Sequence, residues 1–108
     1  YNNETCLLLR SYFEDSGALV TISNNGLSAV EMMQNAPNRF DCIFLDLILP
    51  DINGREVLNR IRNFNANVPV FIMSGHDMSS FISEHSNDQN LFFLMKPFNL
   101  KDLDVLLK

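Results

Sequence analysis

The sequence predicts an open α/β sheet of parallel strands joined by right-handed crossovers, and three observations indicate this fold class. Four short apolar runs, rich in Val, Ile, Leu and Phe, do not alternate strictly with polar residues, which is typical of strands buried on both faces. Segments with helical spacing separate these runs, so that a first helix is followed by strand and helix four times over. At 108 residues, the chain has the length of one domain.

The first half of the chain supplies two helices and one strand. Residues 3–16 place apolar side chains three and four positions apart, which predicts a helix, and Gly17 supplies its stop. The apolar run 18–22 predicts the first strand. Residues 25–34 predict the next helix, with an apolar stripe along one face and Asn25 as its N-cap.

The second half of the chain repeats the alternation of strand and helix three times. Each of its helical segments carries apolar residues on one face, and Asp77 is the expected N-cap of the middle one. The predicted strands are 42–45, 68–73 and 91–95, and the predicted helices are 55–64, 77–84 and a last one that opens at Asn99 or Leu100. Helices between successive strands supply the crossovers that a parallel sheet requires.

Composition and charge exclude several functional classes. Hydrophobic residues make up 46% of the chain, too many for a disordered tail, and no apolar run approaches the ~20 residues of a membrane span. Eight Lys and Arg against thirteen Asp and Glu give a net charge of −5, so we expect no direct binding of nucleic acid. The sequence shows no retained secretory signal, and Cys6 and Cys42 fit reduced core residues of a cytoplasmic protein.

Polar residues follow each predicted strand, at the sheet edge where folds of this class carry out their chemistry. Asp46, Ser74 and Lys96 follow the second, third and fourth strands, and Asn24 and Asn25 follow the first. Taken singly, a carboxylate or a serine at such a place is equally well explained as a helix N-cap, and a lysine before proline can simply end a strand. An aspartate, a hydroxyl and an amine that converge on one edge favour a functional site.

Three motifs surround these residues. They are F-L-D-L-I-L-P-D-I-N-G, F-I-M-S-G-H-D and F-L-M-K-P-F. In the first, Pro50 and Gly54 set a tight connection into the next helix, which we expect to leave Asp46 exposed. Together, from Ser11 to Lys108, they resemble the receiver domain of two-component response regulators. The resemblance implies a doubly wound, flavodoxin-like parallel sheet of five strands in the order 2-1-3-4-5. It also implies an aspartate that accepts a phosphoryl group from a histidine kinase or phosphotransfer protein.

The resemblance implies a role for each matching residue. Asp46 matches the phosphoacceptor, since a carboxylate oxygen can attack the phosphorus of a phosphohistidine. Lys96 matches the lysine that contacts the phosphoryl group, and Ser74 matches the switch hydroxyl. Phe93 matches the aromatic switch, although a core aromatic residue explains it equally simply. The backbone carbonyl of Ile48, together with Asp46, matches the ligands of Mg²⁺.

The resemblance also implies that the side chains of Ile48 and His76 occupy positions that gate the water that hydrolyses the phosphoryl group. A solvated loop histidine is the simpler explanation of His76, and His85 is expected to be solvated on its helix. At nine residues apart, the two histidines do not form a metal-binding pair.

The N-terminal part of the chain departs from the family pattern. The family begins with a strand that ends in two acidic residues, which hold Mg²⁺, and here the acids Glu4, Glu14 and Asp15 come too late in the chain to serve. Asp46 and the Ile48 carbonyl are then the remaining ligands, so we expect Mg²⁺ to bind weakly or not at all. The missing strand leaves three alternatives for a receiver domain over residues 1–108. We expect a domain that is truncated at its N-terminus; the other two are a strand donated by a second copy and a degenerate receiver that has rearranged.

The function that the sequence favours is that of a phosphoacceptor receiver, a signalling domain that catalyses only its own phosphorylation and dephosphorylation. Phosphorylation would reset the surface of the last two helices and the last strand, which would bind an output domain or a dimer mate. The alternative is a degenerate pseudo-receiver that acts as a phosphate-independent protein-binding module. Separate enzymes are disfavoured. A phosphatase or mutase of the haloacid dehalogenase type, which uses an aspartyl phosphate, requires a second aspartate where Ile48 stands, and a dinucleotide enzyme requires a G-x-G-x-x-G motif that the chain lacks.

Overall fold

The fold is built on a sheet of three parallel strands in this computed structural model, which describes residues 3–107. The strands are β1 (Ile43–Asp46), β2 (Val70–Ser74) and β3 (Leu91–Met95), in the order β1-β2-β3. Leu45 lies in register with Ile72 of the central strand, and Ile72 lies in register with Phe93. The last three predicted strands are therefore confirmed, with ends that differ by no more than two residues.

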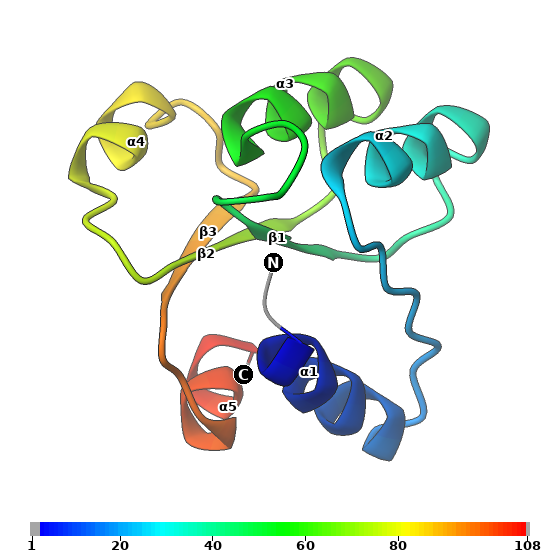
Figure 1. The fold of residues 1–108 in the computed structure, drawn as a ribbon, viewed down its shortest axis with the longest axis vertical. Helices are drawn as coiled ribbons and strands as arrows, with labels where there is room; N and C mark the ends of the chain where they lie inside the picture. The colour runs from blue at the N-terminus through cyan, green and yellow to red at the C-terminus, as the bar shows by residue number, and fades with distance from the viewer. Residues whose placement is uncertain (1–2, 108) are drawn as a thin grey trace.

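Helices cover both faces of this sheet (Figure 1). They are α1 (Asn3–Asp15), α2 (Gly26–Asn35), α3 (Gly54–Phe64), α4 (Ser79–Glu84) and α5 (Leu100–Leu107). In Figure 1, α2, α3 and α4 lie on one side of the sheet, and α1 and α5 lie on the other. The predicted α/β class with a parallel sheet between two helical layers is confirmed. Within residues 3–107, none of the helices combines the length and the hydropathy needed to cross a bilayer.

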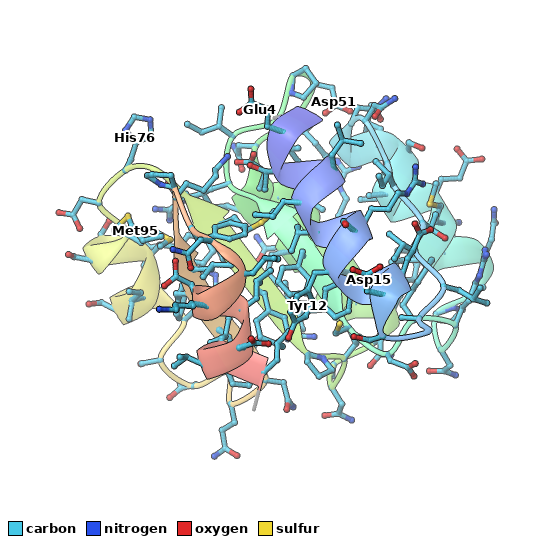
Figure 2. The ribbon with its side chains drawn as sticks, turned by 90° about the horizontal axis from the view of Figure 1, so that it is seen from below. Glu4, Tyr12, Asp15, Asp51, His76 and Met95 are labelled. Carbon is cyan, nitrogen blue, oxygen red and sulfur yellow. The ribbon has the colours of Figure 1, made fainter. Side chains whose placement is uncertain are left out.

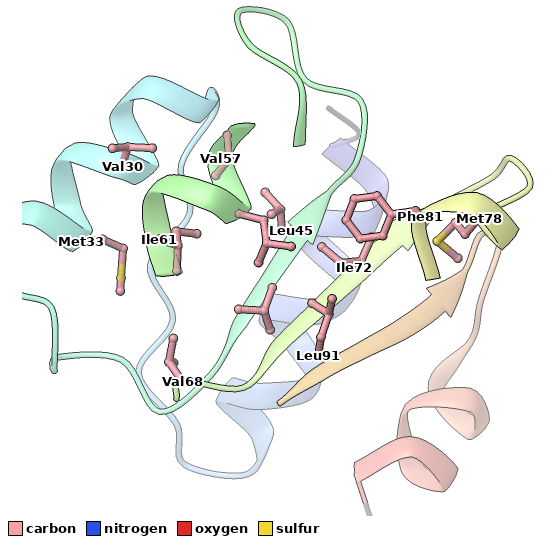
Figure 3. Packing of buried hydrophobic residues seen from close by; sticks show 12 residues of the cluster. Val30, Met33, Leu45, Val57, Ile61, Val68, Ile72, Met78, Phe81 and Leu91 are labelled. Atoms are coloured by element: carbon pink, nitrogen blue, oxygen red, sulfur yellow. The ribbon is translucent and has the colours of Figure 1, made fainter. Parts of the chain in front are cut away.

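The central strand β2 contributes side chains to two separate hydrophobic cores, because these side chains point alternately to the two faces of the sheet. On the face of α2, α3 and α4, Ile72 packs in a cluster with Val57, Ile61 and Phe81 (Figure 3). On the opposite face, Met73 packs in a second cluster with Leu9 of α1, Leu94 of β3 and Leu103 of α5. All five residues of β2 are buried, which makes it the most constrained strand of the sheet.

Asparagine residues are the N-caps of α2 and α3, two of the helices on the first face. Asn25 accepts a hydrogen bond from the backbone N–H of Ser28 at 2.8 Å and is the N-cap of α2, as predicted. Asn53 accepts one from the N–H of Glu56 at 2.9 Å and is the N-cap of α3. The predicted N-cap of α4, Asp77, was wrong by one position, because Met78 is the residue that directly precedes the helix. The side chain of Asp77 still accepts the backbone N–H of Ser79.

The strand predicted at 18–22 does not form. The segment has no strand pairing in the described structure, and Leu19 is fully exposed, at 102% of its reference area. A parallel strand needs a neighbour for its backbone N–H and C=O groups, and among residues 3–107 the sheet runs from β1 to β3 with β1 at its edge. The apolar run therefore reflects strand propensity without a partner. Of the predicted order 2-1-3-4-5, the last three strands are present in that order.

Candidate functional site

The carboxyl ends of the three strands and the start of α1 line one pocket. Asp46 ends β1, Ser74 ends β2, and Lys96 follows β3. The pocket has a volume of about 660 Å³, and all three residues line it. The three residue types that the sequence placed on one edge are therefore brought together, whereas Asn24 and Asn25 do not line this pocket.

Asp46 and Lys96, which both line the pocket, form an ion pair. Lys96 Nζ donates to Asp46 Oδ2 at 2.7 Å, across 50 positions of sequence. The exposed fraction is 12% for the Asp46 side chain and 18% for that of Lys96, so solvent screens the pair only in part. The expectation that Asp46 is exposed was wrong: its side chain is largely shielded from solvent and is paired with Lys96.

Ser74 is held in place by its own loop. The residue is 2% exposed, and its Oγ accepts a hydrogen bond from the backbone N–H of His76 at 3.0 Å. The backbone C=O of Ser74 accepts the N–H of Lys96 at 2.7 Å, which ties the end of β2 to the residue that carries the amine. A hydroxyl that lines the pocket while bonded to its own loop can exchange that bond for one to a group in the pocket.

The loop between β1 and α3 presents a backbone amide to the carboxylate. The N–H of Ile48 donates to Asp46 Oδ1 at 3.2 Å, while Lys96 contacts Oδ2. The N–H of Gly54 closes the loop by donating to the C=O of Leu47 at 2.9 Å. A Cβ at position 54 would lie 2.7 Å from Leu47 Cα and 2.8 Å from the backbone carbonyl oxygen of Asp46, so only glycine fits here without displacing the backbone next to Asp46.

Comparison with known sequences decides the family. A sequence model of the response regulator receiver domain matches residues 2–108. The chain belongs to the response regulator receiver domains. Proteins of this family act in two-component signalling rather than as metabolic enzymes.

Curated relatives and solved structures agree with this assignment. The transcriptional regulatory protein ZraR of Klebsiella oxytoca is 29% identical over 102 residues, which cover 94% of this chain and 23% of ZraR. The probable transcriptional regulator ycf29 of Porphyra purpurea is 32% identical over 110 residues, which cover 98% of this chain and 52% of ycf29. The crystal structure of a two-component response regulator from Clostridium difficile superposes with a TM-score of 0.84 at 27% identity, over 99% of this chain and 86% of that one. This receiver domain thus spans a quarter of ZraR and half of ycf29.

Phe93 lies outside the pocket of the receiver domain. It is half-buried against the core beneath α4, where its ring meets that of Phe81 edge-on at 6.0 Å. This position agrees with the simpler explanation of a core aromatic residue. It also places Phe93 against Phe81 of α4.

The two histidines lie in different surroundings. His76 is exposed and lines the pocket beside Ser74 (Figure 2). His85 was expected to be solvated, and this was wrong: its ring stacks on Phe81 at 4.2 Å, and Nδ1 lies 2.9 Å from the backbone oxygen of the same residue. Its ring is therefore part of the α4 packing.

Sequence reasoning missed the contribution of α1 to the pocket. Glu4, Thr5 and Leu8 line it, and Figure 2 shows Glu4 at the first turn of α1. Glu4 was set aside because of its place in the sequence, yet the packing of α1 brings it to the same pocket as Asp46. The available signal was the helix register: the first turn of a helix packed on a parallel sheet can reach the carboxyl edge of the strands.

The oxygen atoms of the pocket suit a hard cation. Mg²⁺ is bound through one or two carboxylates and keeps several of its waters, and the pocket contains the carboxylates of Asp46 and Glu4. No group of three or more His, Cys, Asp or Glu side chains among residues 3–107 is arranged to enclose a metal. The donors therefore fit a largely hydrated Mg²⁺ rather than an ion in a closed protein cage.

Proposed function

We propose that this receiver domain accepts a phosphoryl group on the carboxylate of Asp46 from a histidine kinase or a phosphotransfer protein. The observation that carries the proposal is the contact of 2.7 Å between Lys96 Nζ and Asp46 Oδ2 inside a pocket that Ser74 also lines. Phosphoryl transfer depends on positioning and on neutralising charge, and this arrangement supplies a nucleophile, a cation and a hydroxyl.

The transfer requires no further covalent partner from the protein. One oxygen of the Asp46 carboxylate attacks the phosphorus atom of a phosphohistidine and forms a P–O bond. The P–N bond breaks, and the imidazole nitrogen keeps its electron pair and takes up a proton. The product is an acyl phosphate on Asp46. The ammonium group of Lys96, which pairs with the carboxylate before transfer, can pair with a phosphoryl oxygen after it.

Mg²⁺, when bound, neutralises charge on the phosphoryl oxygens and helps to orient them. Asp46, the backbone carbonyl of Ile48 and the carboxylate of Glu4 are the residues we propose to hold it. With so few protein ligands, the affinity for Mg²⁺ should be low before the phosphodonor adds its own oxygens.

The proposed switch connects this pocket to a protein-binding surface. The Ser74 hydroxyl would leave the N–H of His76 and bond the phosphoryl group, and Phe93 would follow it inward and release α4. The surface of α4, β3 and α5 carries exposed apolar side chains, which suits an output domain or a second copy as partner. These side chains are Ile82, Met95, Leu100 and Val105.

Incubation with acetyl phosphate and Mg²⁺, followed by intact-mass analysis, tests the proposal. We expect one phosphoryl group per chain, removed by hydroxylamine as acyl phosphates are, and none on Asp46→Asn. Asp41→Asn is the matched control, since Asp41 is exposed just before the opposite end of β1. Retention of the label in Asp46→Asn would refute the assignment.

A phosphate-independent binding module is the second candidate, favoured by the lack of a three-ligand metal cluster among the described residues. It predicts no labelling by acetyl phosphate at any Mg²⁺ concentration. It also predicts that Asp46→Asn binds the same protein partner as the unmodified chain.

A further inference from the structure

The carboxylate of Asp51 reaches from the loop that follows Asp46 to the start of α2. Asp51 Oδ1 accepts the backbone N–H of Gly26, and Oδ2 accepts that of Leu27, each at 2.8 Å. Both oxygens are therefore engaged by a helix 24 and 25 positions away in sequence. Figure 2 shows Asp51 at the same end of the molecule as Glu4, which lines the pocket.

These two bonds do more than complete a helix cap. Asn25 already caps α2 through the N–H of Ser28, so the N–H groups of Gly26 and Leu27 are the ones left for a second acceptor. Those groups could be solvated by water at the surface. Instead they bind a carboxylate on another element, which fixes the position of that element relative to α2.

Gly26 allows the close approach that the contact needs. A Cβ at this position would lie 2.7 Å from Val57 Cγ2, 2.8 Å from Ile52 Cγ1 and 3.3 Å from Asp51 Oδ1. The start of α2 is thus seated directly on the loop and on the first turns of α3. A glycine and a carboxylate, from different parts of the chain, meet in one contact.

The loop of residues 47–53 has its other attachments close to the phosphoacceptor. Its base is closed by the bond from Gly54 N–H to Leu47 C=O, and the N–H of Ile48 donates to Asp46. Asp51 supplies the attachment at the far side of the loop, to a helix outside it. Displacement of Asp51 would be transmitted over three residues to Ile48, which contacts the carboxylate and lines the pocket.

We propose that Asp51 is a positioning residue for phosphoryl transfer: by binding the N–H groups of Gly26 and Leu27, it holds the 47–53 loop so that Ile48 and Asp46 face the pocket correctly. This inference rests on the proposed function of Asp46. It assigns to Asp51 no contact with the phosphoryl group. A displacement of reacting groups by about 1 Å can slow a reaction by roughly a hundredfold, so an attachment outside the pocket can control the rate.

Three variants test the proposal with acetyl phosphate at a fixed concentration. Asp51→Ala removes both acceptors and should slow labelling of Asp46 by roughly tenfold to a hundredfold. Asp51→Asn retains one acceptor oxygen and should restore part of the rate. Asp102→Ala is the matched control, because Asp102 is an exposed carboxylate that accepts the N–H of Asn99 at the start of α5, and it should label at the unmodified rate.

Hydrogen exchange and unfolding measurements separate positioning from general destabilisation. We expect faster amide exchange in residues 47–53 in Asp51→Ala and unchanged exchange there in Asp102→Ala, with similar losses of unfolding free energy in both. A normal labelling rate in Asp51→Ala, or equal slowing in Asp102→Ala, would overturn the inference and leave the proposed function intact. If Asp51→Ala does not fold, a normal rate in Asp51→Asn overturns it. An unmodified chain that is never labelled on Asp46 would instead refute the proposed function, and this inference with it.

Discussion

At the scale of single residues, the chemistry proposed for Asp46 depends on the charge of Lys96. The two side chains meet at 2.7 Å, and both are largely shielded from water. In such surroundings a cation stabilises developing negative charge more strongly than it would in bulk water. The charge of Lys96 can therefore be tested apart from its packing, because methionine has a similar length and no charge.

We expect Lys96→Met to slow labelling of Asp46 by acetyl phosphate by at least about tenfold, which corresponds to roughly 1.4 kcal/mol of transition-state stabilisation. The rate of phosphoryl incorporation, followed by intact mass, measures this. Lys101→Met removes an exposed lysine of α5 with the same change in net charge and should leave the rate unchanged. Equal slowing in the two variants would contradict a specific role for Lys96.

The residues of the pocket were predictable from the sequence where they end strands. Asp46, Ser74 and Lys96 each follow an apolar run, and parallel strands bring such positions to one edge whatever the details of packing. Glu4 could not be predicted in this way, since its place depends on how α1 lies across the sheet. Neither could the shielding of Asp46, which depends on how separate parts of the chain pack around the end of β1.

At the scale of elements, the start of α2 is stabilised by a carboxylate that titrates abnormally. The N–H group of Leu27 is the main cause that holds the pKa of Asp51 below its ordinary value of 3.8; desolvation opposes it, and the N–H of Gly26 adds to the lowering. A carboxylate with a lowered pKa in the folded state stabilises the fold above its unfolded pKa. This contribution is lost as the pH falls toward the folded pKa.

We therefore expect Asp51→Asn to lower the unfolding midpoint in urea at neutral pH, with a difference from the unmodified chain that shrinks as the pH falls below about 3.8. Urea titrations at several pH values between neutral and acidic measure this difference. The chain with Asp51 should lose stability more steeply in that acidic window than the variant. A difference that stayed constant with pH would show that Asp51 does not stabilise α2 through its charge.

The elements themselves show what a local pattern can and cannot predict. The apolar faces of α2 and α3 and the N-cap Asn25 are local features, and the predicted helices match the observed ones closely. The run 18–22 is apolar, as β3 is, but forms no strand in the described structure, because pairing depends on a neighbour. Strand propensity is a property of a segment, whereas membership of a sheet is a property of the fold.

At the scale of the whole molecule, Arg62 of α3 stabilises the amino ends of the strands, which lie opposite the pocket. Its guanidinium donates to Asp88 at 2.8 and 3.4 Å, to the C=O of Val68 at 2.7 Å and to that of Asn90 at 3.1 Å. Val68 precedes β2 and Asn90 precedes β3, so one side chain joins a helix to the starts of two strands. This link could not be predicted from the sequence, because its acceptors are mostly backbone carbonyls, which any residue type supplies.

Substitution of Arg62 should therefore lower the unfolding free energy of the whole domain. The side chains of Arg62 and Asp88 are 16% and 20% exposed, and removal of one member of a largely buried pair leaves the other charge and the carbonyls poorly solvated. We expect Arg62→Met to lower the unfolding free energy by roughly 2–4 kcal/mol, measured by urea titration. Arg60→Met is the matched control on the same helix, since Arg60 pairs with Glu56 at the exposed surface and should cost less than about 1 kcal/mol. The pocket lies at the carboxyl ends of the strands, away from Arg62, so folded Arg62→Met should still be labelled on Asp46 at the unmodified rate. Equal destabilisation by Arg62→Met and Arg60→Met would contradict a special role for Arg62.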